Sequence, residues 1–105
     1  MTRDAKSFTL LSGVTSAGAG TAANFEGRVG ESFNAIIRAA SVTLGGTMKI
    51  EAWFPGLADW SSIDTQTITA NGDYLVYWTG PILGLRANLS ARTDGTFSVE
   101  AVVMF

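Results

Sequence analysis

The residues that could do chemistry are few in kind. The chain of 105 residues has no cysteine and no histidine, which excludes thiolate nucleophiles, thiolate-bound metals and imidazole bases. Nine acidic and seven basic side chains remain, with many hydroxyls. Glu51 with Glu100, or Asp59 with Asp64, could stand as the paired carboxyls of a glycosidase, about 5 to 10 Å apart. Any chain with nine acids offers such pairs, so we expect no catalytic residues and no enzyme activity.

Other reactive arrangements are equally weak. A serine or threonine nucleophile would need Lys6 or Lys49 as its base, and neither lies in a recognisable motif. The glycine-rich segments precede no lysine and no helical pattern, as a phosphate-binding loop would require. Four aspartates fall in or near turns but form no dense acidic loop for calcium: Asp59, Asp64, Asp73 and Asp94. We expect turn-forming aspartates, no metal and no cofactor.

The charge content bears on possible partners. Charged residues are 15% of the chain, against about 25% in an average soluble domain, and the net charge is −2. The basic residues are dispersed, which argues against nucleic acid, and no apolar run of about 18 residues could cross a membrane. Nothing near Met1 indicates an export signal. A surface this neutral suits either a monomer covered by Ser, Thr, Asn and Gly or a subunit buried against neighbours, and we favour the subunit.

The elements that must position these residues are strands. Apolar residues recur at period two, and Gly, Thr and β-branched residues disfavour helix. We expect an all-β, antiparallel β-sandwich of the jelly-roll or immunoglobulin-like kind, with seven or eight strands and essentially no helix. Residues 8–105 are predicted to form this single domain, preceded by an N-terminal arm or disordered tail over residues 1–7.

Three turn signals predict three hairpins. Gly45-Gly46, Asn71-Gly72 and Asp94-Gly95 supply the positive φ that tight hairpin turns require. We therefore predict antiparallel pairing of 32–44 with 47–54, of 63–69 with 74–78, and of 85–91 with 96–105. Alternation predicts the core-facing positions Met48, Ile50, Ala52 and Phe54, and then Phe97, Val99, Ala101, Val103 and Phe105.

An internal similarity links two of these regions. Residues 37–52 and 85–101 share an apolar-Arg-Ala start, a Gly-Thr turn exit and an apolar-Glu-Ala end. Similar hairpins could converge on such residues, or the two regions could occupy equivalent places in two facing sheets. In the second case Arg38 with Glu51, and Arg86 with Glu100, would form cross-strand ion pairs.

Four aromatic residues are candidates for a partner interface: Trp53, Trp60, Tyr77 and Trp78. Trp53 lies on the polar face of its predicted strand, Trp60 falls in a loop, and Trp78 alternates with Tyr77. Core packing, burial against another subunit and stacking on a sugar ring are three roles open to them.

The order of features along most of the chain resembles small bacteriophage virion proteins of the β-sandwich or jelly-roll type. The features are Ser-Ala-Gly-Ala-Gly-Thr at 16–21, Ile50-Glu51-Ala52-Trp53, a Pro-Gly loop leading to Trp60, Asn71-Gly72-Asp73-Tyr74, the segment 84–90 and a final Gly-Thr-Phe-Ser-Val. The resemblance implies a capsid decoration or cement protein, located in the virion after assembly in the host cytoplasm. Its partners would be other virion proteins, the major capsid protein first, and further copies of itself, with a trimer favoured. A neck or tail subunit and a carbohydrate-binding adhesive module are the alternatives.

Overall fold

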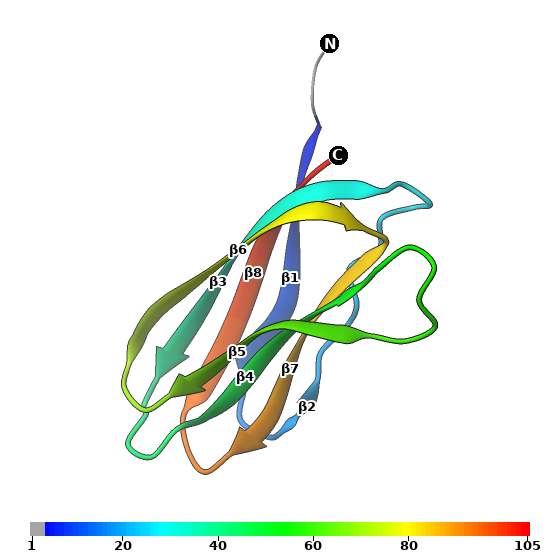
Figure 1. Cartoon of the computed structure of the whole chain (residues 1–105). Coiled ribbons are helices and arrows are strands. Elements are labelled where there is room, and N and C mark those ends of the chain that lie inside the picture. The colour runs from blue at the N-terminus through cyan, green and yellow to red at the C-terminus, as the bar shows by residue number, and fades with distance from the viewer. Residues whose placement is uncertain (1–3) are drawn as a thin grey trace.

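The computed structural model describes residues 4–105, which form eight strands in two four-stranded sheets that pack face to face (Figure 1). No helix is found in this part of the chain, and so none that could span a membrane. The strands are β1 (Ala5–Val14), β2 (Gly18–Ala19), β3 (Gly30–Ala40), β4 (Gly46–Trp53), β5 (Ser61–Ile68), β6 (Gly72–Ile82), β7 (Gly84–Arg92) and β8 (Thr96–Met104).

The strand order identifies the architecture. One sheet has the order β1-β8-β3-β6 and the other β2-β7-β4-β5, and every pairing is antiparallel. Along the chain, only β4 and β5 are consecutive strands paired in one sheet; the other connections cross between the sheets. This is the eight-stranded jelly roll and not the strand arrangement of an immunoglobulin domain. The predicted all-β antiparallel sandwich is confirmed.

The three predicted hairpins are wrong. β3 pairs with β6 and β8, while β4 pairs with β5 and β7, so residues 41–45 form an arch from one sheet to the other. The connections β5–β6 and β7–β8 are arches too. Gly45 does have the expected positive φ of 84°. A positive φ allows the chain to reverse in a hairpin and in an arch alike, so it does not distinguish the two. Each strand here buries its apolar face against the opposite sheet.

The core lies between the two sheets and follows the predicted alternation. Met48, Ile50 and Ala52 are fully buried, as are Phe97, Val99 and Val103. Phe54 and Phe105 are only partly buried, because each lies just beyond the end of its strand. The predicted inward faces of β4 and β8 are therefore correct up to the strand ends.

One carboxylate holds the arches together at one end of the sandwich. Asp94 accepts hydrogen bonds from the backbone N–H groups of Thr43 at 3.0 Å, Leu44 at 3.0 Å and Gly45 at 2.9 Å. These bonds, with that of Thr43 the largest contribution, lower the pKa of Asp94 below its ordinary value. Asn71 Oδ1 accepts from the N–H of Val42 at 2.8 Å, which ties the β5–β6 arch to the same place.

The similar regions 37–52 and 85–101 lie side by side in both sheets. β3 pairs with β8 and β4 with β7, so each region crosses from one sheet to the other and the two lie side by side. The predicted ion pairs are wrong, because the partners lie in different sheets. Arg38 Nε is instead 3.9 Å from Asp73, and Arg86 Nε is 2.7 Å from Glu51.

The N-terminal arm predicted over residues 1–7 differs from the structure in its last part. Residues 1–3 lie outside the described residues. Ala5, Lys6 and Ser7 belong to β1 and pair with Met104, Val103 and Val102. The backbone of β8 offers these residues a ladder of hydrogen bonds, so the strand begins earlier than its apolar pattern indicates.

Candidate assembly surface

The four predicted interface aromatics do not form one surface. Trp53 and Trp60 lie on the outer side of the β2-β7-β4-β5 sheet, Tyr77 lies on the outer face of the opposite sheet, and Trp78 faces the interior. They therefore have three separate environments.

Trp53 and Trp60 are held by internal contacts. Their rings meet edge to face at 5.5 Å and 88°. The guanidinium carbon of Arg86 lies 4.6 Å from the Trp60 ring centre, and Arg86 Nε donates to Glu51 Oε1 at 2.7 Å. Glu51 is only 9% exposed, so this cation shields a nearly buried carboxylate. The cluster of Trp53, Trp60, Arg86 and Glu51 joins β4, β7 and the loop before β5.

Trp78 is part of the interior. It lies opposite Phe33 in the β3–β6 register, and its ring packs against Phe54 at 5.5 Å. Its Nε1 is buried and, within residues 4–105, has no hydrogen-bond partner. This aromatic contributes to packing at the sandwich end and offers little to a partner.

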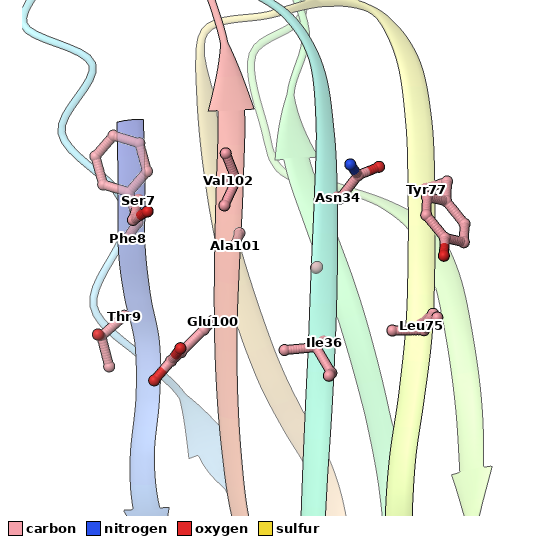
Figure 2. A pocket seen from close by; sticks show the side chains of 11 residues that line it. Ser7, Phe8, Thr9, Asn34, Ile36, Leu75, Tyr77, Glu100, Ala101 and Val102 are labelled. Carbon is pink, nitrogen blue, oxygen red and sulfur yellow. The ribbon is translucent and has the colours of Figure 1, made fainter. Parts of the chain in front are cut away.

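Tyr77 belongs to an exposed apolar patch on the outer face of the β1-β8-β3-β6 sheet. Tyr77 is 65% exposed, and Leu75, two residues before it on β6, is 54% exposed. The strand register places Ile36 of β3 beside Leu75, while Val102 of β8, which is 40% exposed, lies one strand beyond Asn34. We call Ile36, Leu75, Tyr77 and Val102 the outer-face patch. Figure 2 shows these side chains on three neighbouring strands.

Sequence reasoning found one member of this patch and missed three. The alternation that sets Tyr77 outward also sets Leu75 outward, so the signal for Leu75 was present in the Tyr74–Trp78 run. The signal for Val102 was present as well, because the predicted inward positions Ala101 and Val103 leave it on the opposite face. Ile36 lies in a run rich in apolar residues on both faces, and its pattern did not show which side chains would point outward.

The patch borders a shallow hollow of about 390 Å³ that spans all four strands. Polar side chains from the same face also line it: Ser7, Thr9, Asn34 and Glu100. Glu100 is exposed and lies between Thr9 and Ile36 in the register, and Figure 2 shows its carboxylate directed toward β1. Among residues 4–105, no basic nitrogen lies within 4.0 Å of it.

The acids considered as catalytic pairs either lie on opposite sides of the sandwich or accept hydrogen bonds from neighbouring residues. Glu51 points outward from one sheet and Glu100 from the other, so the sandwich lies between them. Asp59 accepts from the N–H of Trp60, and Asp64 accepts from the N–H of Thr65 and from Gln66 Nε2. The described part of the chain contains no group of three or more acidic side chains that could hold a metal ion. Glu51, Asp59 and Asp64 therefore have structural partners.

Comparison with known proteins identifies a solved structure with a similar fold. No protein-family model and no curated protein matches the chain. A solved structure has the same fold. It is the crystal structure of SPBc2 prophage-derived protein YomS, which superposes with a TM-score of 0.65 and 14% identity and covers 100% of this chain and 96% of the other. At this identity the likeness establishes the shared fold.

What the outer face can do follows from its composition. Its exposed side chains are mainly aliphatic, aromatic and hydroxyl groups, with the Asn34 amide and the Glu100 carboxylate among them, and the central strands β8 and β3 are paired on both sides. Their backbones have no free ladder edge, so recognition on this face must use side chains. A surface of this kind suits side-chain packing against another macromolecule.

Proposed function

We propose that this chain is a non-enzymatic structural protein of a bacteriophage particle that binds a neighbouring virion protein through the outer-face patch. The observation that carries the proposal is the exposure of Leu75 and Tyr77, together with Val102, on one face of one sheet. Contiguous apolar side chains cost free energy in water, and covering them is the usual source of protein association. Tyrosine in particular is enriched among residues that dominate interface energies.

Two further observations support this setting. The low charge content is expected of a subunit that loses surface to neighbours. The protein with the same fold is described as prophage-derived, which is compatible with a phage origin for this chain. The aromatic platform expected for sugar binding is reduced, because the Trp60 ring contacts Arg86 and Trp53.

In its specific form, the proposal is a capsid decoration protein located where capsid subunits meet. Many copies binding in a regular array need only a modest contact each, since neighbouring contacts raise the effective concentration. A homo-oligomer, with a trimer favoured, would strengthen such binding. A neck or tail subunit would use the same face on a different partner.

The test is the protein composition of gradient-purified particles from cells that carry the gene, measured by quantitative mass spectrometry. We expect the wild-type chain in every preparation at a fixed copy number. The double variant Leu75→Ser/Tyr77→Ser should fall at least tenfold, whereas Leu57→Ser, which removes an exposed leucine from the β4–β5 loop, should not. Absence of the wild-type chain, or equal incorporation of the double variant, would show the proposal to be wrong.

A further inference from the structure

The outer face carries an unbalanced charge at its centre. On the neighbouring strands β3, β6 and β8, the side chains of Arg38, Asp73 and Glu100 project from this face, and Glu100 lines the hollow. Arg38 and Asp73 approach each other at 3.9 Å, which leaves Glu100 as the one charge in this set without an opposite partner. Within this set the one unpaired charge is therefore the Glu100 carboxylate, which lies on the central strand β8 beside the apolar side chains.

A macromolecule that covered this face would remove water from Glu100. A carboxylate taken out of water without a cation or hydrogen-bond donor is strongly unfavourable, and its partner must come from the covering molecule. A second copy packed face to face would bring another Glu100 with an Arg38 and an Asp73 that cancel each other, so these six groups together would carry a net charge of −2. The chemistry of the face thus favours a different protein that supplies a cation.

The spacing of the anchors defines that partner further. Leu75 and Tyr77 are on β6, and Glu100 is on β8, with β3 between them. Neighbouring strands are about 4.8 Å apart, so the two anchor points are separated by about 10 Å across the sheet. Ile36 and Asn34 lie between them (Figure 2).

Resting on the proposed function, we infer that the virion partner presents a lysine or arginine that pairs with Glu100 and, about 10 Å away, an apolar or aromatic side chain that covers Leu75 and Tyr77. The cation gives orientation and specificity, and the apolar anchor gives most of the affinity. The partner surface is basic at this point, opposite to the acidic character of this chain.

The experiment adds purified chain back to particles that lack it and measures the concentration at half-saturation. Glu100→Gln removes the charge and keeps the shape, and Glu100→Lys reverses the charge. We expect Glu100→Gln to weaken binding about tenfold and Glu100→Lys at least a hundredfold, with a steeper salt dependence for the wild type than for Glu100→Gln. Asp59→Asn is the matched control: it removes one charge far from the face and keeps the oxygen that accepts from Trp60, and it should bind as the wild type does.

The outcomes separate the inference from the proposed function. If the wild type binds, Tyr77→Ser weakens binding and both Glu100 variants bind normally, the basic partner is wrong and the structural role stands. If the wild type binds no particle, the proposed function itself fails. A dimer in light scattering that Tyr77→Ser converts to monomer would assign the face to a second copy. Competition by neutral oligosaccharides would assign it to a glycan, and either result overturns the inference.

Discussion

At the scale of single residues, Glu51 and Arg86 show how a charge is kept on a largely covered surface. The Glu51 side chain is 11% exposed and that of Arg86 is 26% exposed, with 2.7 Å between Oε1 and Nε. The Trp60 ring covers the guanidinium, so the pair is shielded from water. In contrast, Arg38 and Asp73 are each more than half exposed and 3.9 Å apart.

This contrast predicts different costs for removing each arginine. Arg86→Met leaves the Glu51 carboxylate without its cation, and we expect the free energy of unfolding to fall by about 2 to 4 kcal/mol. Arg38→Met, the control, should cost at most about 0.5 kcal/mol because exposed pairs contribute little. Urea unfolding measures both. A loss from Arg86→Met as small as that from Arg38→Met would contradict the role of the pair.

Residue-scale features of the fold were largely visible in the sequence. Period two located the buried positions of β4 and β8, and it set Tyr77 and Trp78 on opposite faces without showing which of them points outward. The partner of each arginine was not predictable, because it depends on which strands are neighbours. Arg38 lies beside Asp73 because β3 pairs with β6. These two strands are separated by two other strands along the chain.

At the scale of elements, the arch between β3 and β4 depends on Gly45. Its φ is 84°, and a Cβ atom at this position would collide with the carbonyl group of Ile68. We expect Gly45→Ala to lower the melting temperature strongly, since the arch must move to remove the collision. Gly56→Ala is the control, with φ 82° and open space around it, and should cost only about 1 kcal/mol of strain. Equal melting temperatures for the two variants would contradict the packing of the arch.

The Asp94 carboxylate gives the same arch a pH dependence. Its pKa is lowered in the folded state by the N–H groups of Thr43, Gly45 and Leu44, so it stabilises the fold above its unfolded pKa. That stabilisation is lost as the pH falls through the folded pKa. The melting temperature of Asp94→Asn should therefore lie below that of the wild type at neutral pH and approach it well below pH 3.8, the ordinary value. Scanning calorimetry across this range tests it, with Asp73→Asn as control. A difference independent of pH would be the contrary result.

The element scale is where sequence reasoning failed. Gly45-Gly46, Asn71-Gly72 and Asp94-Gly95 do mark reversals of chain direction, but all three are arches. The local residues report the φ angles of the turn, whereas the choice between hairpin and arch depends on long-range pairing such as β3 with β8. Asp94 accepts hydrogen bonds from the arch that precedes β4, and Gly45 in that arch lies 49 residues before Asp94 in the chain. No local sequence pattern reveals this contact.

At the scale of the whole molecule, the jelly roll has two unlike outer faces. One carries the cluster of Trp53, Trp60, Arg86 and Glu51, whose polar and aromatic groups contact one another. The other carries the outer-face patch, whose apolar side chains remain in water, with Glu100 beside them. The sequence indicated an unusually neutral surface but not its location, because the face assembles from β3, β6 and β8, which are distant in sequence.

The most direct test of the assembly surface is the solvent accessibility of Tyr77 in the particle. Hydroxyl-radical labelling with mass spectrometry would compare Tyr77 in the free chain and in purified particles, with the half-buried Tyr74, which donates to the Ala70 carbonyl, as the internal reference. We predict that labelling of Tyr77 falls several-fold in the particle while that of Tyr74 does not change. Equal labelling of Tyr77 in both states would contradict the assignment of this face to assembly.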